Sequence, residues 1–289
     1  MAPYGDTVPL PPRPQPGPAA GRGLVAGQGL VAGPGRAPGL RHAPRRRLRR
    51  FAYRVTLTAA SLLACVAIAF GLLLVFTPGA GQAMEIASKL ARQRHVAYPG
   101  PPVPENFAQP LVATEDHRFY SELGGVDPLA IGRVARSAVT GGPDQGGATI
   151  EVQLAKMLYI GMAQPAGIED KLKEVALAVK LDSMYTKAEV LQMYAEVAYY
   201  GHGFYGLQAA SCGYFGHPPA ELTVAQGAML AGVVNSPSGD NPIRHPAQAR
   251  ARLVHVIERM VAVGYLTPEQ GGAALSGPLG LTPGHSPAC

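Results

Sequence analysis

Cysteine is scarce in this chain, and no two cysteines have the spacing of a metal site. Three occur in 289 residues: Cys65 in an apolar run, Cys212 in a segment of small residues, and Cys289 as the last residue given. The sequence therefore implies no disulfide framework and no cysteine-bound metal. We expect Cys212 to be a small buried residue that fills space in the core.

Positive charge is also scarce once the first 54 residues are set aside. The formal net charge is +6, but ten arginines and one aspartate give residues 1–54 a charge of +9, so residues 55–289 carry −3. The folded part therefore lacks the basic balance of a nucleic-acid-binding domain. We expect no nucleic acid among the partners.

Residues 1–54 consist mostly of proline, glycine, alanine and arginine. Such a segment cannot bury enough apolar surface to offset the entropy of ordering it, so we predict a disordered, basic, cytoplasmic tail. Residues 78–270 are numerous enough to form a real core, and we predict one domain there. Residues 271–289 are rich in glycine and proline, which predicts a flexible C-terminal tail.

Residues 55–77 form an apolar run of 23 residues without a charge, long enough to span a bilayer as a helix. A cleavable signal peptide and a buried helix of a soluble protein are the alternatives. The preceding arm is longer than a signal n-region, and arginines crowd the start of the run, so we favour an uncleaved, single-pass anchor in the cell membrane. The arginines place the N-terminus in the cytoplasm and residues 78–289 outside.

Helical patterns dominate the remaining sequence. We predict helices over residues 84–94, 108–120, 128–139, 148–160 and 170–185, and a loop over 141–147. In the last helix the apolar stripe is Leu172, Val175, Ala176 and Val179, which puts Glu174 about 160° away, on a face turned from the core. Capping boxes begin further helices at 186–189, 223–226 and 267–270. Without alternating strand patterns, these features predict an all-α domain.

Two short stretches carry the residues that chemistry would need. Glu115 and Asp116 form a carboxylate pair beside Phe119 and Tyr120, and Lys156 lies in an apolar helix opened by a Gly-Gly turn. A carboxylate can act as a base, and a fixed cation can stabilise a pyrophosphate leaving group. Behind a membrane anchor, this combination indicates an enzyme that works on a pyrophosphate-linked sugar.

Five blocks over residues 112–242 together resemble one family, the peptidoglycan glycosyltransferase domain of penicillin-binding proteins and monofunctional transglycosylases (glycosyltransferase family 51). The blocks are EDHRF at 115–119 with GVDP at 125–128, GGATIEVQLAK at 146–156, KLKE at 171–174, residues 187–216, and residues 222–238. The resemblance implies a lysozyme-like, two-lobed helical fold with a small membrane-facing lobe. It also implies polymerisation of lipid II into β-1,4-linked glycan with release of undecaprenyl pyrophosphate.

The resemblance also implies roles for single residues. Glu115 matches the family's catalytic base, and Glu174 matches its second essential glutamate, which would orient a lysine or the donor sugar. The expected substrate-binding residues are Asp116, Phe119, Thr149, Gln153, Lys156, Lys171 and Lys173. No cofactor is implied, and a divalent ion bridging a glutamate and the pyrophosphate stays an open alternative. The expected partners are lipid II, the growing glycan, the membrane and other cell-wall synthesis proteins.

Some positions depart from the family's usual pattern, and they are Ala148, Glu151, Asp170, Glu196 and Gln226. Glu151 and Asp170 add acids near the expected pyrophosphate site, and Ala148 removes a hydroxyl. A unit charge about 4 Å away is worth about 4 kcal/mol at an effective dielectric of about 20, so Glu151 facing the site would abolish turnover. Facing solvent, it would be screened and matter little.

Three hypotheses about function follow from this pattern. The first is an active monofunctional glycosyltransferase, since the sequence contains no Ser-x-x-Lys transpeptidase motif. The second is a weak or silent homologue that binds lipid-linked wall precursor or scaffolds wall enzymes. The third is a lytic hydrolase of finished glycan, which a single glutamate can support.

Overall fold

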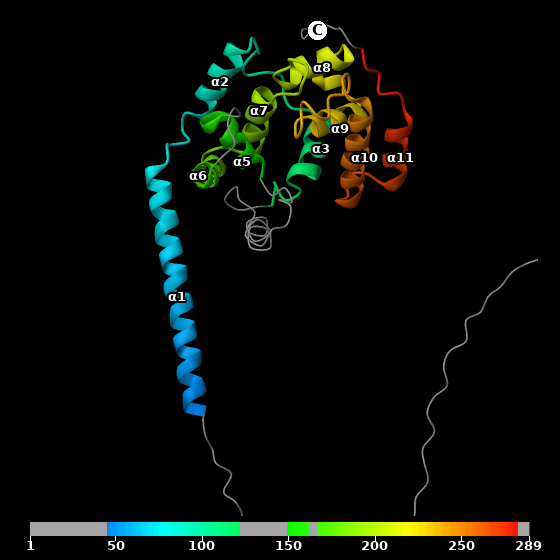
Figure 1. Cartoon of the computed structure of the whole chain (residues 1–289). Coiled ribbons are helices and arrows are strands. Elements are labelled where there is room, and N and C mark those ends of the chain that lie inside the picture. The colour runs from blue at the N-terminus through cyan, green and yellow to red at the C-terminus, as the bar shows by residue number, and fades with distance from the viewer. Residues whose placement is uncertain (1–44, 122–148, 162–166, 283–288) are drawn as a thin grey trace, which may run out of the picture. The chain divides into compact units, whose positions relative to one another are not determined.

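Helices account for nearly all regular structure in the computed structural model (Figure 1). The structure describes residues 45–121, 149–161, 167–282 and 289. No strand is found among these residues, whose one isolated bridge pairs Tyr199 with Tyr205. The all-α prediction is therefore confirmed. Residues 1–44 of the predicted tail over 1–54, the predicted helix over 128–139 and the predicted loop over 141–147 lie outside the described residues. Residues 45–54 of that tail are helical, so the prediction of disorder is wrong for them.

The longest helix is α1 (Arg45–Phe76), and its part over Arg49–Phe76 is long and apolar enough to cross a membrane. The most apolar window of this helix has a mean hydropathy of 2.7 and is not buried by the protein. Burial in a protein core therefore does not explain its composition. The helix passes through the boundary between two compact units, Met1–Leu57 and Thr58–Cys289.

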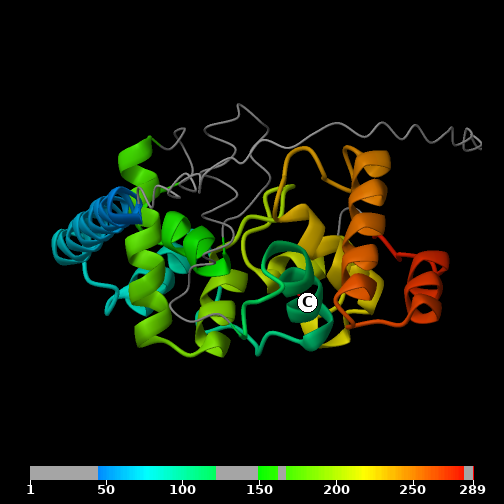
Figure 2. The ribbon, with the colours of Figure 1, turned by 90° about the horizontal axis from the view of Figure 1, so that it is seen from below.

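The second unit contains two groups of helices, which lie on different sides of the domain in both ribbon views (Figures 1 and 2). The first group comprises α2 (Ala83–Gln93), α5 (Ile150–Ala155), the π-helical turn η1 (Lys156–Ile160), α6 (Ile168–Met184) and α7 (Lys187–Val197). In this group α5 packs against α6 and α7, and α2 packs against α7. The predicted helix over 148–160 thus changes its winding at Lys156.

The second group surrounds α9. It comprises α3 (Glu105–Glu115), α8 (Leu207–Phe215), the short 3₁₀ turn η2 (Pro219–Glu221), α9 (Val224–Val233), α10 (Pro246–Ala262) and α11 (Pro268–Ser276). Helix α9 is buried from Ala225 to Val233, and α3 and α10 pack against it. Glycine at Gly227 permits the close approach to α3, because a Cβ there would lie 1.7 Å from the carbonyl oxygen of Asn106.

The buried face of α6 includes Ala176 of the predicted stripe but otherwise differs from it. Leu177, Ala178 and Leu181 are buried, whereas Leu172 is 51% exposed. Glu174 lies three residues before Leu177, on the same side of the helix, and is only 8% exposed. The prediction that Glu174 is turned away from the interior is therefore wrong. The predicted stripe began at Leu172, which lies near the start of α6, where half of its surface is exposed.

The folded domain extends beyond the predicted boundary at residue 270. A capping box at Thr267 begins α11, which continues to Ser276 and packs against α10. After α11, the backbone amide of Thr282 donates to the carbonyl oxygen of Tyr214 at 2.8 Å. The prediction of a flexible tail is wrong for residues 271–282, because the helix cap and this contact attach them to the domain.

A disulfide joins Cys212 of α8 to Cys289, 77 residues later. Cys212 is fully buried, as predicted, but it is not a free cysteine that merely fills space. The sequence implied no disulfide framework, yet the structure contains this one disulfide among the described residues. The reason is that two cysteines far apart in sequence give no local spacing from which a pair can be read.

Candidate active site

A cavity of about 540 Å³ opens where the two groups of helices meet. Its lining includes two carboxylates, Glu115 and Glu174, and two cations, Lys156 and Arg252. Four helical elements supply these residues, namely α3, α6, η1 and α10. Residues predicted from three separate sequence blocks, including Gln153, thus share one cavity.

Glu115, the last residue of α3, is held in this cavity by three donors. Arg252 Nη2 donates to its Oε1 at 2.9 Å, and Gln153 Nε2 donates to its Oε2 at 3.0 Å. Asn235 Nδ2 reaches both carboxylate oxygens, at 3.3 and 3.1 Å. The Glu115 side chain is only 7% exposed. An ionised carboxylate accepts such hydrogen bonds at both oxygens, so the arrangement suits a base.

Gln153 is itself oriented by a buried phenol. The hydroxyl of Tyr194 donates to Gln153 Oε1 at 2.8 Å, which leaves the amide nitrogen pointing at Glu115. Burial raises the pKa of the fully buried Tyr194 well above its usual value, and the charge of Glu115 adds to the rise. The hydroxyl therefore keeps its proton and stays a donor to Gln153.

Sequence reasoning missed two of the three donors to Glu115. Arg252 lies on α10, after the last block of the resemblance, and Asn235 lies inside that block but was not singled out. A signal for Arg252 was present, because it shares a helical stripe with the buried Ala249 and Val256. Glycine at Gly232 of α9 makes room for it, since a Cβ there would lie 2.8 Å from Arg252 Cγ.

Lys156 and Glu174 form the other half of the cavity. Lys156 begins the π-helical turn η1, a type of irregularity that is frequent at functional sites. Burial raises the pKa of Glu174, while the charges of Lys156 and Lys171 oppose the rise. Glu174 Oε1 is buried without a hydrogen-bond partner among the described residues. Glu174 can therefore accept a further donor, from Lys156 or from a sugar.

The other two predicted lysines do not line this cavity. Lys173 forms an exposed ion pair with Glu169, at 2.8 Å and one helical turn away. Lys171 is exposed in the first turn of α6, near enough to Glu174 to affect its pKa. Of the three lysines predicted to meet the pyrophosphate, Lys156 alone is a lining residue in the part of the chain that the structure describes.

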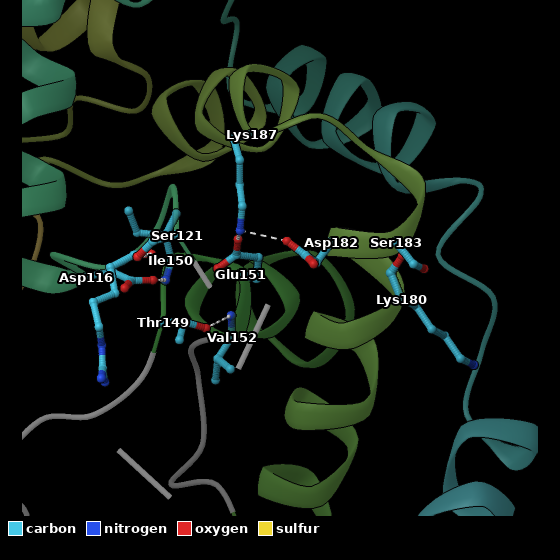
Figure 3. Close-up of polar contacts among 11 residues, drawn as sticks. Asp116, Ser121, Thr149, Ile150, Glu151, Val152, Lys180, Asp182, Ser183 and Lys187 are labelled. Atoms are coloured by element: carbon cyan, nitrogen blue, oxygen red, sulfur yellow. Dashed lines mark hydrogen bonds and ion pairs between the residues drawn. The ribbon is translucent and has the colours of Figure 1, made fainter. Parts of the chain in front are cut away.

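Three residues predicted to bind substrate lie behind the cavity instead of lining it. Asp116 Oδ2 accepts from the backbone amide of Ile150 at 3.3 Å. Thr149 caps α5 by accepting from the amide of Val152 at 3.3 Å (Figure 3). Phe119 is fully buried. These contacts join the end of α3 to the start of α5. They thereby fix where Gln153 lies relative to Glu115.

Glu151 faces neither the cavity nor the solvent, so both alternatives for it are wrong. It is fully buried, and its Oε1 lies 2.6 Å from Lys187 Nζ. Lys187, the first residue of α7, points toward Glu151 and Asp182, and its Nζ lies 2.6 Å from Asp182 Oδ1 (Figure 3). The same Nζ lies 4.5 Å from the ring centre of Phe119. Burial raises the pKa of Glu151, and the hydrogen bond and charge of Lys187 lower it, with a net rise. The acid is thus paired with a cation inside the protein, through its Oε1.

Asp170 and Gln226 serve as helix caps. Asp170 Oδ2 accepts from the backbone amide of Gly167 at 3.3 Å, at the N-terminus of α6 where a negative charge is favourable. Gln226 Oε1 accepts from the amide of Thr223 at 2.9 Å and completes the capping box of α9. Neither residue lines the cavity. Ala148 lies outside the described residues.

Glu196 ties a loop to α7. It is buried, and its Oε1 accepts hydrogen bonds from the backbone amide of Gly100 and from Gln192 Nε2. Burial raises the pKa of Glu196, and these two hydrogen bonds oppose the rise. This departure from the family pattern therefore changes a contact between a loop and a helix. It adds no charge to the cavity.

Comparison with known proteins gives a family model described as Transglycosylase, which matches residues 82–261. Penicillin-binding protein 1A of Aquifex aeolicus is 39% identical over 61% of this chain and 24% of that protein. Penicillin-binding protein 1F of Bacillus subtilis is 38% identical over 62% and 25%. Penicillin-binding protein 1A of Mycobacterium tuberculosis is 38% identical over 59% and 21%. The chain spans about a quarter of the length of these relatives. The matched range includes α10 and Arg252.

Proposed function

We propose that this chain, which belongs to the transglycosylase family, is a peptidoglycan glycosyltransferase that polymerises lipid II into β-1,4-linked glycan and releases undecaprenyl pyrophosphate. The observation that carries the proposal is the Glu115 carboxylate, held by three donors in a cavity of about 540 Å³ that also contains Lys156. Its proposed partners are lipid II, the growing glycan, the membrane and other wall-synthesis proteins.

In the proposed reaction Glu115 accepts the proton of the acceptor sugar hydroxyl. The hydroxyl oxygen attacks the anomeric carbon of the donor on the face opposite the pyrophosphate, and the configuration inverts. The bond from that carbon to the pyrophosphate oxygen breaks, and its electron pair leaves with the pyrophosphate. Arg252, Asn235 and Gln153 keep the base oriented toward the hydroxyl.

Lys156 supplies the fixed cation that the leaving group needs. A cation already in place stabilises charge as it develops, without a cost of reorganisation at the moment of reaction. Glu174 lines the same cavity, and its pKa responds to the charge of Lys156, so the two groups interact. We propose that Glu174 orients the Lys156 ammonium group toward the pyrophosphate.

Several residues differ from the family's usual pattern, and the contacts that they make inside the protein favour an active enzyme over a silent homologue. Glu151 was the departure with the largest expected penalty, and its charge is paired with Lys187 behind the cavity. In the described part of the lining, the acidic residues are Glu115 and Glu174, both expected from the family. A dianionic pyrophosphate therefore meets no additional acid there.

The proposed reaction uses acid–base chemistry and fixed charges, and it includes no organic cofactor. The described residues contain no cluster of three or more His, Cys, Asp or Glu side chains that could hold a metal ion alone. If a divalent ion assisted the pyrophosphate, Glu174, with its unpartnered buried Oε1, is a carboxylate of the described lining that would hold it, and the ion would supply positive charge to the leaving group.

We propose that α1 anchors the enzyme with its N-terminus in the cytoplasm and the catalytic domain outside. Support comes from the length and hydropathy of α1 and from the arginines at its start. The disulfide between Cys212 and Cys289 gives independent support, because disulfides persist in oxidising compartments and are rare in the cytosol.

The test is polymerisation of lipid II by the purified full chain, followed on gels that resolve glycan strands. We expect polymer from the wild type and a loss of at least about 100-fold for Glu115→Gln, since the base is removed. Glu105→Gln, at the exposed start of the same helix, should behave as the wild type. Lipid II binding without polymer from well-folded protein would support the silent homologue, and muropeptide release from isolated wall would support the hydrolase.

A further inference from the structure

A second cavity, of about 450 Å³, adjoins the candidate active site. Tyr199 lines both cavities. The segment after α9 also passes from one to the other, since Asn235 lines the first cavity and Pro237 lines the second. A substrate in the catalytic cavity can therefore extend a branch into the second one without leaving the protein surface.

The second cavity contains one fixed positive charge, on Arg244. Arg244, His202 and His245 line it, and no carboxylate is among its described lining residues. The cavity also lies at the N-terminal end of α10, whose helix dipole favours anions. We call it the Arg244 cavity. Its charge and its polar lining suit an anionic group.

The backbone of Arg244 is held in place by a buried side chain. Asn241 is 2% exposed, and its Oδ1 accepts from the backbone amides of Ile243 and Arg244 at 3.0 and 3.1 Å. Its Nδ2 donates to the hydroxyl of Tyr214 at 3.3 Å. These contacts bind the main chain and leave the guanidinium group of Arg244 uncommitted within the described residues. The cation is thus presented from a rigid turn.

The opposite wall is held in an unfavourable backbone conformation. His202 has a φ of 54°, in the left-handed region that non-glycine residues seldom occupy. The turn is packed tightly, because a Cβ at Gly201 would lie 2.4 Å from the carbonyl oxygen of Pro237. The amide of Gly203 also donates to the Tyr199 hydroxyl at 3.2 Å. Backbone strain that the surroundings enforce in this way is concentrated at functional sites.

We propose that the Arg244 cavity binds a carboxylate of the peptide branch carried by the glycan substrate. This inference rests on the proposed function. Lipid II has two anionic parts, a pyrophosphate and the carboxylates of its peptide. Lys156 in the catalytic cavity is placed for the pyrophosphate, so the peptide carboxylate is the anion that a neighbouring cationic cavity can accept. The planar guanidinium of Arg244 can bind a carboxylate through two parallel hydrogen bonds.

The test measures binding by the full chain carrying Glu115→Gln, so that no turnover occurs. Fluorescently labelled lipid II is titrated in two forms, one with free peptide carboxylates and one with those carboxylates amidated. Adding Arg244→Gln should weaken binding of the free form about tenfold, since a charge-assisted contact is lost, and leave the amidated form within about twofold. Arg92→Gln, an exposed arginine of α2, serves as the control and should change neither.

If Arg244→Gln weakens binding of both forms of lipid II equally, or weakens binding of neither form, the inference is wrong. Neither result bears on polymerisation by the wild type. A third probe, a lipid-linked disaccharide pyrophosphate without the peptide, tests whether the Arg244 cavity binds the pyrophosphate instead of the peptide carboxylate. If Arg244→Gln weakens that probe as much as the free form, the cavity binds pyrophosphate and the inference is wrong. If the Glu115→Gln chain binds none of the probes and the wild type makes no polymer, the proposed function falls as well.

Discussion

At the scale of single residues, Glu115 is placed by groups that come from distant parts of the chain. Gln153 follows it by 38 residues, Asn235 by 120 and Arg252 by 137. Two of these donors are neutral amides, and Arg252 alone among the three brings a charge. The Arg252 side chain is 21% exposed, so the ion pair with Glu115 is only partly screened by solvent.

Arg252→Met should therefore impair catalysis more than folding. We expect the rate of polymerisation to fall roughly 10- to 100-fold, as is usual when a hydrogen bond to a charged group is lost. Arg259→Met, on the same helix, is the matched control and should keep wild-type activity. Gel-based polymerisation rates and thermal unfolding in the same detergent separate the two effects. An active Arg252→Met variant would show that Glu115 needs no cation to position it.

At the scale of helices, the cluster of Glu151, Lys187 and Asp182 joins α5, α6 and α7. Glu151 is fully buried, and its Oε2 has no partner among the described residues. Its contribution to stability thus depends on Lys187, whose removal leaves an uncompensated buried carboxylate. Breaking a buried ion pair from one side is strongly destabilising, whereas removing both charges is much less so.

Lys187→Met should lower the free energy of unfolding by about 3–5 kcal/mol. Adding Glu151→Thr should restore most of that loss, because the fully buried carboxylate is then removed and Asp182 is partly exposed. Urea unfolding followed by circular dichroism measures both variants. The Glu189→Gln variant, which alters an exposed capping box on the same helix, should lose only about 1 kcal/mol. If the double variant is no more stable than Lys187→Met, the pairing argument is wrong.

At the scale of the whole molecule, features that depend on nearby residues could be predicted, whereas those that depend on distant ones could not. The capping boxes at Thr186, Thr223 and Thr267 correctly begin helices, because a cap involves only four consecutive residues. The partner of Glu151 is 36 residues away, and the partner of Cys212 is 77 away, so no local pattern revealed either. The family blocks brought Glu115 and Gln153 to one site, since they carry long-range information that periodicity lacks.

The disulfide also makes the membrane orientation testable in cells. If the domain lies outside the cytoplasm, Cys212 and Cys289 should be oxidised there. Cells that express a Cys65→Ala chain are quenched with acid, and the protein is denatured and treated with a polyethylene-glycol maleimide, which adds mass at each free thiol. We expect no added mass without reductant and two labels after reduction. Cys289→Ser in the same background should take one label without reductant, because Cys212 then has no partner. Two labels without reductant in the Cys65→Ala chain would mean that the thiols are reduced in the cell, and the proposed orientation would be wrong.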